Sequence, residues 1–316
     1  MNYLVIGHPC LDEIHTAGGK VVTSWGGIIY AIAALDFASS GTDVIHPVFP
    51  ICKDDERAFR DFIARFRHVD ASGVYPVDGP TNRVRLFYPD GDEHGARQEH
   101  CECVLPEIDF ERLREPMQEN DLVLVNMVSG FELSLDTIRQ IYKAGHRHTP
   151  IYLDVHAMAL GDLVPDGARR FKRVVDWREW LQCVNFVQLN EREAKYFGRS
   201  PKAIADFAAI DRRVEAIIIT RGSQGSTILI RDGNDLPAVN DTFSRIDIPP
   251  VSLGPALDST GCGDVFGAAF MASYAWKRNP VIAAQFGNFA GAAKSLASGI
   301  DGLETLRTYI QQYPRS

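Results

Sequence analysis

The sequence predicts an α/β fold: a doubly wound, mainly parallel sheet flanked by helices. Two observations lead to this fold class. Short apolar runs rich in β-branched residues alternate with helical stretches along the chain. Four of these runs are apolar almost throughout, which is typical of parallel strands that helices cover on both faces. The four runs are Asp121–Met127, Pro150–Val155, Asn185–Asn190 and Glu215–Thr220. Alternating strands and helices of this kind form a layered α/β domain.

The N-terminal part of the chain follows the same alternation. Asn2–Gly7 predicts a buried strand, and Gly27–Gly41 predicts a helix that ends at a glycine. Residues 43–51 predict the next strand. Asp54–Phe66 predicts an amphipathic helix with an acidic first turn, which suits the positive end of the helix dipole.

Two stretches contain strands and turns but no helix, and they predict a small β-sheet lid. They are residues 12–25 and 81–104, with a hairpin turn expected at Pro-Asp-Gly-Asp, residues 89–92. The main domain is then formed by residues 1–11, 26–80 and 105–316. A small sheet beside the carboxyl ends of the large sheet could close over a ligand. Its edge favours pairing with a second copy, so we expect a homodimer through the lid.

Composition limits the function classes. The formal net charge of the 316 residues is -8, which argues against a nucleic-acid partner because such proteins need a basic face. The N-terminus lacks the features of a secretory signal, and no apolar run reaches membrane-spanning length. The six cysteines are scattered, as is typical of free thiols in a reducing compartment. We therefore expect a cytoplasmic protein with no membrane partner.

Residues 257–270 combine a dense group of glycines with two aspartates and a following apolar helix. Gly261, Cys262 and Gly263 are expected to form the turn that leads into this helix, with Asp264 at its start. Free amides at a helix N-terminus favour an anion, such as a transferring phosphoryl group. Asp264 would then act as a general base. Taken alone, the stretch fits equally well an aspartate that only satisfies first-turn amides.

Asp258–Asp264 resembles the C-terminal signature of the PfkB carbohydrate kinases, the ribokinase-like family. The resemblance implies that Asp264 is the catalytic base and also contacts the substrate. It implies that the amides of Gly261, Cys262 and Gly263 form an anion hole, and that Asp258 supports this loop.

Further segments resemble the family's nucleotide and metal motifs, in the family's order. Asn190 and Glu193 match an Asn-x-x-Glu motif that organises Mg²⁺ and its waters near the nucleotide phosphates. The resemblance implies that ATP and Mg²⁺ are required. It also implies a monovalent cation as a possible further cofactor, but no residue of this chain can be assigned to it. The remaining residues that it implies in nucleotide binding are Thr220, Gly222, Gly225 and Asn288.

The acceptor side resembles the family in part. Asp12 is implied as a ligand of the acceptor hydroxyls, and Gly26 and Gly27 as backbone contacts to the substrate. Ribokinase itself has polar side chains at three nearby positions where this chain has Cys10, Ile28 and Ala31. Because lost hydrogen bonds change selectivity steeply, we expect the acceptor to be held differently from ribose.

The sequence therefore predicts an ATP-dependent kinase that transfers the γ-phosphoryl group to a hydroxyl of a small sugar-like acceptor. One alternative is a nucleoside kinase, in which Trp25, Tyr30 or Phe87 could stack on a base. Another is a non-catalytic sensor of sugars or nucleotides. A phosphosugar acceptor would need cations, and the available ones are Lys53, Arg83, Arg85 and Arg97. Cys101 and Cys103 lack the second ligand pair that a structural zinc site needs.

Overall fold

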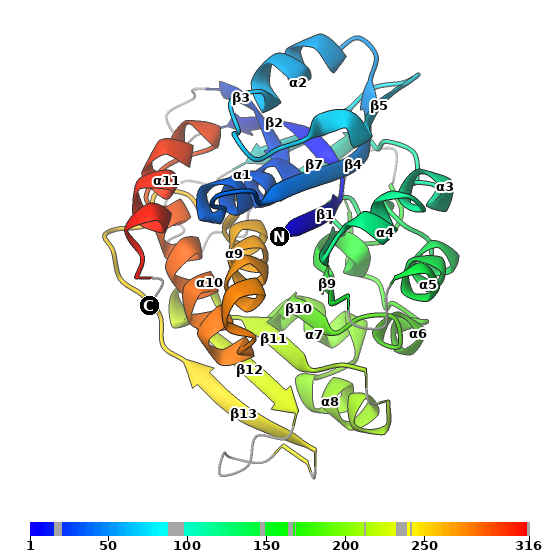
Figure 1. Ribbon diagram of the computed structural model, residues 1–316, viewed down its shortest axis with the longest axis vertical. Coiled ribbons are helices and arrows are strands. Elements are labelled where there is room, and N and C mark those ends of the chain that lie inside the picture. Colours follow the sequence, from blue (N-terminus) through cyan, green and yellow to red (C-terminus); the bar gives the residue numbers. More distant parts are fainter. Residues whose placement is uncertain are drawn as a thin grey trace.

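A nine-stranded sheet forms the centre of the protein (Figure 1), as given by a computed structural model. The model describes residues 1–15, 21–87, 98–145, 149–163, 167, 169–211, 213–231, 239–240 and 242–314. From one edge to the other, the strands are β13 (Phe243–Ile248), β12 (Ser226–Arg231), β11 (Ala216–Thr220), β10 (Phe186–Asn190), β9 (Ile151–Asp154), β8 (Leu122–Asn126), β1 (Asn2–Ile6), β4 (Val44–Cys52) and β5 (Val74–Val77). All neighbours pair in parallel except β11–β12 and β12–β13, which are antiparallel.

The order of the strands reverses next to β1. The chain moves from β1 to β4 and β5 on one side, and later fills the other side from β8 to β13. Ligands of open α/β sheets bind at the carboxyl ends of the strands at such a reversal. The ends of β1 and β8 therefore mark the place where a site is expected.

Helices cover both faces of the sheet, as Figure 1 shows. One face carries α1 (Ile28–Ala38), α9 (Cys262–Lys277), α10 (Pro280–Ser295) and α11 (Leu303–Gln312). The opposite face carries α3 (Phe110–Leu113), α4 (Pro116–Glu119), α5 (Leu135–Ala144), α6 (Trp177–Leu181), α7 (Glu191–Phe197) and α8 (Pro201–Ile210). Parallel strands covered in this way must be apolar throughout, and β8 and β9 are buried along their whole length.

Helix α2 and four one-turn 3₁₀ helices complete the described elements. α2 (Glu56–Ile63) places Phe59 against Phe49 of β4, with ring centroids 5.6 Å apart. The 3₁₀ helices are η1 (Ala71–Gly73), η2 (His156–Ala159), η3 (Gly222–Gln224) and η4 (Ile300–Gly302). Among the described residues, no helix is both long enough and apolar enough to cross a membrane.

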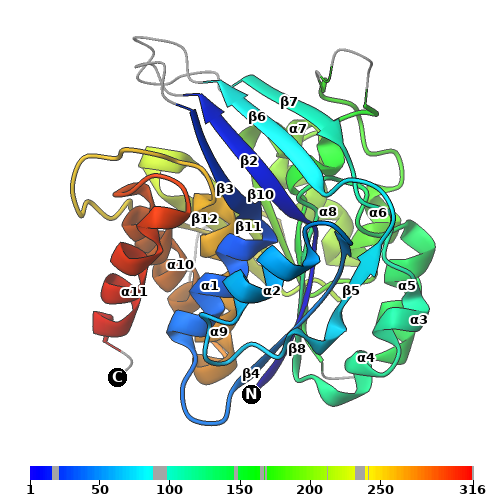
Figure 2. The ribbon, with the colours of Figure 1, turned by 90° about the horizontal axis from the view of Figure 1, so that it is seen from above.

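A second sheet of four strands stands at one end of the molecule (Figure 2). Its order is β3 (Val21–Gly27), β2 (Pro9–His15), β6 (Asn82–Phe87) and β7 (Gln98–Cys103). β2 continues from β1 after two residues, so the small sheet begins at the carboxyl end of the large one. β3 and β7 are its outer strands, and the homodimer through this sheet stays a prediction, as do the domain bounds.

The predicted fold class is confirmed, and two local predictions are wrong. The helix expected to end at Gly41 ends at Ala38, because Ser39 leaves the helical conformation for an extended backbone, with φ -71° and ψ 157°. The helix expected to begin near Asp264 begins at Cys262, and Gly261 alone caps it. The hairpin turn expected at residues 89–92 lies outside the described residues.

Candidate functional site

Asp264 lies in the first turn of the buried helix α9. Gly261 caps this helix with φ +77°, a left-handed conformation that favours glycine. A Cβ at Gly261 would also come within 2.5 Å of Cγ of Tyr30. The helix start leaves the amides of Gly261 and Gly263 without an intrahelical acceptor. The Cys262 amide, by contrast, donates to the Ser259 carbonyl at 3.2 Å.

The carboxylate of Asp264 is buried and held by a neighbour from the sheet. Asn126, the last residue of β8, donates from Nδ2 to Oδ1 of Asp264 at 2.6 Å. Asn126 Oδ1 is buried without a hydrogen-bond partner in the described part of the chain. Gln188 of β10 fixes the same turn, because its Nε2 donates to the Gly263 carbonyl at 3.1 Å. Asn126 thus orients Asp264, and Gln188 holds the turn just before it.

Asp258 ties the loop before α9 to the end of α10. Its Oδ1 accepts from the Thr260 amide at 2.8 Å, and its Oδ2 accepts from the Gly299 amide at 2.9 Å. The Nζ of Lys294, which is fully buried, lies 3.9 Å from Oδ2. Burial alone would raise the pKa of Asp258, but these amide hydrogen bonds and the Lys294 charge hold that pKa below its usual value. Asp258 therefore stays ionised and supports the loop.

Lys294 contacts Asp258, Ala297 and Tyr30 among the described residues. Besides approaching Asp258, its Nζ donates to the Ala297 carbonyl at 3.1 Å and lies 5.2 Å from the ring centroid of Tyr30. A fully buried lysine is rare and costly unless it is paired. Lys294 thus connects the Asp258 loop to the ring that packs on Gly261.

The predicted acceptor residues meet where β2 and β3 approach α1. Gly26 faces Cys10 across the β2–β3 ladder, and a Cβ at Gly26 would come within 1.9 Å of Asp12 Oδ2. The carboxylate therefore lies directly against the backbone. Gly27 caps α1 with φ +63°, and a Cβ there would collide with the His8 carbonyl and the Cys10 sulfur. Only glycines fit this turn.

A cavity of about 370 Å³ opens beside the outer strand of the small sheet. Ser24 lines it from β3, and Ser298 and Gly299 line it from the turn that donates to Asp258. Ser24 lies directly opposite Asp12 in the β2–β3 register. Directly opposed residues of an antiparallel pair share a face of the sheet, so the Ser24 and Asp12 side chains point to the same side.

The predicted nucleotide residues lie at the carboxyl ends of two neighbouring strands. Asn190 ends β10 and pairs in register with Thr220, which ends β11. Gly222 and Gly225 frame the one-turn helix η3, and the Gly225 amide donates to the Gly222 carbonyl at 3.1 Å. Asn288 of α10 donates to the carbonyls of Ile248 and Pro249, at the end of β13. The structure thus brings Asn190, Thr220 and the glycine turn together, while Asn288 holds the backbone beside them.

Glu193 forms a capping box with Asn190 at the start of α7. Its Oε2 accepts from the Asn190 amide at 2.7 Å, and its Oε1 from Asn190 Nδ2 at 2.5 Å. Burial raises the pKa of Glu193 to about 7, and the charge of Asp264 adds to this effect. Burial also raises the pKa of Asp154 at the end of β9, with further contributions from Glu193 and Asp264.

These carboxylates fit a hydrated Mg²⁺. Among the described residues, no group of three His, Cys, Asp or Glu side chains is arranged to bind a metal ion directly. The charges of Glu193 and Asp264 nevertheless add to the raised pKa of Asp154, and the charge of Asp264 adds to that of Glu193, so a nearby cation would stabilise the ionised forms of Asp154 and Glu193. Mg²⁺ keeps several waters in protein sites, and it can be held through them by one or two carboxylates.

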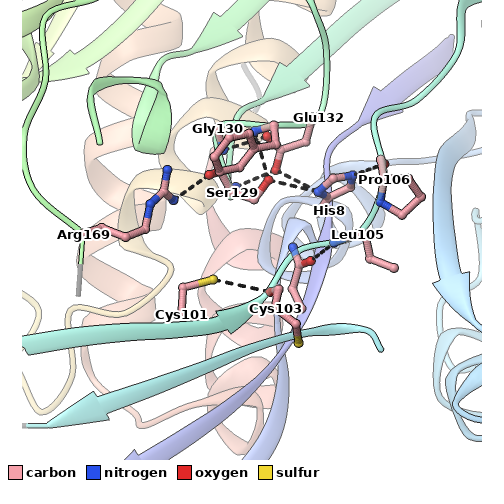
Figure 3. A network of polar contacts seen from close by, with 11 residues as sticks. His8, Cys101, Cys103, Leu105, Pro106, Ser129, Gly130, Glu132 and Arg169 are labelled. Carbon is pink, nitrogen blue, oxygen red and sulfur yellow. Dashed lines mark hydrogen bonds and ion pairs between the residues drawn. The ribbon is translucent and has the colours of Figure 1, made fainter. Parts of the chain in front are cut away.

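A network around His8 fixes the segment after β8 (Figure 3). His8 Nε2 lies 3.1 Å from the Pro106 carbonyl and Nδ1 lies 3.0 Å from Ser129 Oγ. Glu132 accepts from the amides of Ser129 and Gly130. Burial lowers the pKa of His8, although Glu132 opposes this shift. A neutral His8 that donates from Nε2 and accepts at Nδ1 satisfies both contacts, so this network holds Asn126 and the following turn in place.

Arg169 adds a charged contact to the same segment, as Figure 3 shows. Its Nη1 donates to the Ser129 carbonyl at 2.6 Å, and its Nε donates to the Gly161 carbonyl at 3.1 Å. The turn after β8 is therefore connected to the segment after η2.

Comparison with known proteins places the chain in a family. Residues 132–305, more than half of the chain, match the model of the pfkB family carbohydrate kinase. The chain belongs to the pfkB carbohydrate kinase family. A nucleoside kinase of Methanocaldococcus jannaschii is 33% identical over 98 residues, a match that spans 30% of this chain and only 28% of that enzyme.

Solved structures of this family's fold superpose over nearly the whole chain. Arabidopsis thaliana ribokinase, complexed with ribose and ATP, has a TM-score of 0.70 and 18% identity, covering 98% of this chain and 99% of its own. Burkholderia thailandensis nucleoside kinase, in complex with inosine, has a TM-score of 0.69 and 18% identity, covering 99% of this chain and 93% of its own. At these identities the likeness shows the fold.

In this pfkB family member, the residues that sequence reasoning missed are Asn126, Gln188, Asp154 and Lys294. Two of them are the last residues of buried strands, namely Asn126 of β8 and Asp154 of β9, while Gln188 lies in the middle of β10. The position of the first two was a usable signal, because polar residues at such ends face the ligand side of an α/β sheet. Lys294 gives a weaker signal, as a single lysine within a helix of small residues.

Other sequence-based candidates have ordinary contacts. Trp25 packs edge-on against Phe59 at 5.1 Å, and the Phe87 side chain lies outside the described residues. Lys53 pairs with Asp78, and Arg85 pairs with Glu13 and Glu102. Arg97 lies outside the described residues. Cys101 Sγ donates to the Cys103 carbonyl (Figure 3). Cys103 Sγ donates to the Thr81 carbonyl, so both thiols take part in the lid's own hydrogen bonding.

Proposed function

We propose that the protein is a kinase that transfers the γ-phosphoryl group of ATP to a hydroxyl of a small sugar or nucleoside, with Asp264 as the base. One observation carries the proposal: a buried aspartate in the first turn of a buried helix, next to a left-handed glycine cap. Membership of the pfkB carbohydrate kinase family supports the same chemistry.

Asp264 would take the proton of the attacking hydroxyl. Asn126 donates to one of its oxygens at 2.6 Å, which orients the carboxylate and leaves the other oxygen to accept the proton. A positioned carboxylate of this kind contributes about 10²–10⁴-fold as a general base. Burial keeps water away from it, so that the acceptor and not water is activated.

The start of α9 would stabilise the charge on the moving phosphoryl group. The first-turn amides and the helix dipole favour negative charge there. We assign this role mainly to the amides of Gly261 and Gly263, since the Cys262 amide already donates to Ser259. Asp258 and Lys294 hold the loop that positions these amides.

The donor would bind across the ends of β10 and β11. Asn190, Thr220 and the Gly222–Gly225 turn lie together there, near Glu193. When bound, a hydrated Mg²⁺ beside Glu193 and Asp154 would neutralise part of the charge on the donor phosphates. Glu193 is then required in its ionised form.

Two acceptor classes remain proposals. A nucleoside acceptor is supported by the similarity to the nucleoside kinase of Methanocaldococcus jannaschii and by the apolar positions Ile28 and Ala31. A sugar acceptor is supported by the family as a whole. A non-catalytic sensor on the same fold would bind these molecules without turnover.

A coupled assay of ADP release tests the proposal. The panel is ribose, fructose, myo-inositol, inosine, adenosine and cytidine, with ribose 5-phosphate and fructose 6-phosphate as charged acceptors. We expect turnover with Mg-ATP for at least one of them. Asp264→Asn keeps an oxygen for the Asn126 bond but loses the base, so kcat should fall about 10²–10⁴-fold with little change in the KM for ATP. Near-wild-type kcat in this variant would rule out Asp264 as the base.

A further inference from the structure

Tyr30 has a buried hydroxyl without a partner. The residue lies in the first turn of α1 and is 1% exposed, and its Oη has no hydrogen-bond partner within the described residues. Buried polar atoms are nearly always paired, so an unpaired one needs an explanation. Ser24 Oγ and Asn126 Oδ1 are also buried without a hydrogen-bond partner among the described residues.

Each of these three side chains lies next to a residue of the predicted site. Ser24 lies opposite Asp12 in the β2–β3 ladder, and Asn126 donates to Asp264. The Tyr30 ring lies against Gly261, and Lys294 approaches that ring. Burial raises the pKa of the Tyr30 hydroxyl, and the charges of Asp12, Asp258, Cys10 and Asp264 raise it further. The Tyr30 ring therefore contacts the loop before Asp264, and its hydroxyl lies within electrostatic range of Asp12.

The chemistry of these side chains selects the kind of ligand. Asp12, Asp264 and Asn126 Oδ1 offer acceptors, while Tyr30 and Ser24 each offer a hydroxyl that can donate and accept. A ligand that pairs with the unpaired atoms of Tyr30, Ser24 and Asn126 must carry several hydroxyl groups. A phosphate group on the acceptor would lie near the carboxylates of Asp12 and Asp264, whereas the Lys294 charge is already paired with Asp258. The negative charge here disfavours a phosphorylated acceptor.

We propose that the Tyr30 hydroxyl binds the acceptor directly and that the site selects an uncharged polyhydroxylated acceptor over a phosphorylated one. This inference rests on the proposed kinase function. Tyr30 takes over hydrogen bonding that the apolar neighbours Ile28 and Ala31 cannot supply. The same ring, held between Gly261 and Lys294, connects the acceptor to the anion loop.

Tyr30→Phe tests this role because it removes only the oxygen. The oxygen has no partner in the free protein, so its removal should leave the Tm unchanged or raise it. With the acceptor bound, the change leaves an acceptor hydroxyl unpaired. We expect the acceptor KM to rise about 10- to 100-fold, with the KM for ATP unchanged.

Tyr274→Phe is the matched control. Tyr274 lies farther along α9, and its hydroxyl donates to Glu215 Oε2 at 2.9 Å. Its loss should lower the Tm and leave the acceptor KM at the wild-type value. The two variants therefore separate a ligand contact from a structural one.

The possible outcomes distinguish a failure of the proposed kinase function from a failure of the inferred acceptor class or of the role of Tyr30. If the wild type phosphorylates no member of the panel, the kinase function and the Tyr30 inference both fail. If kcat/KM is higher for the sugar phosphates, the inferred acceptor class is wrong while the kinase function stands. If an uncharged acceptor is preferred but Tyr30→Phe keeps the wild-type acceptor KM, the role of Tyr30 alone is refuted.

Discussion

Lys294→Met removes the buried charge that supports the loop before α9. Loss of one partner from a buried ion pair costs about 3–5 kcal/mol. Asp258 keeps donors from Thr260, Gly299 and Ser298, so the loss should lie near the lower end, about 3 kcal/mol. At about 2.1 cal/mol/K per residue, the unfolding entropy of the 316-residue chain is about 0.66 kcal/mol/K. The expected fall in Tm is therefore about 5 °C.

Thermal unfolding followed by circular dichroism measures this change. Lys277→Met is the control, because Lys277 is exposed at the end of α9 and should change the Tm by about 1 °C or less. A double-mutant cycle with Asp258→Asn should show losses that are not additive, since the two side chains share one contact. A Lys294→Met protein that melts within 1 °C of the wild type would refute the idea that Lys294 supports Asp258.

Two further predictions concern the anion loop and the metal side. Gly261→Ala adds a Cβ at φ +77°, 2.5 Å from Tyr30. The left-handed backbone costs an alanine about 1–2 kcal/mol, and overpacking against Tyr30 costs about 1–3 kcal/mol. Together these costs should lower the Tm by roughly 3–8 °C. Its kcat should fall at least tenfold, and a wild-type Tm and kcat would contradict this geometry. The pKa of Glu193 is raised to about 7, so folded protein keeps this proton above the pH at which unfolded protein loses it. Stability should therefore fall as pH rises from about 4.5 to 7, and the Mg²⁺ concentration for half-maximal rate should fall as pH rises through 7. Glu193→Gln should remove both dependences, and their persistence would exclude Glu193 as their source.

The large sheet could be predicted from the sequence because its buried strands appear there as continuous apolar runs. Strands buried on both faces must be apolar throughout, as β8 and β9 are, and such runs are visible without any tertiary information. The start of α9 was less predictable, since Cys262 and Gly263 are weak helix formers. Gly261, which caps this helix, packs against Tyr30 of a distant segment, and such a contact is not visible in local propensity.

The candidate site was predictable only where a local motif carries it. Asp258, Asp264, Asn190 and Glu193 belong to short motifs with fixed spacing. Asn126 is 138 residues from Asp264, and the contact between Lys294 and Asp258 joins two separate segments. Pairs of this kind depend on how strands and helices pack in three dimensions, which periodicity and spacing do not report.

The placement of α9, α10 and α11 has a consequence for synthesis on the ribosome. These helices lie within the last part of the chain, from Cys262 onward, yet they cover one face of a sheet whose central strands come much earlier. Until they emerge, the nascent chain must leave exposed the part of this apolar face that α1 does not cover. Exposed surface of this kind makes partly made chains prone to aggregation. Asp264 also reaches Asn126 only then, so a product truncated before α9 would be both insoluble and inactive.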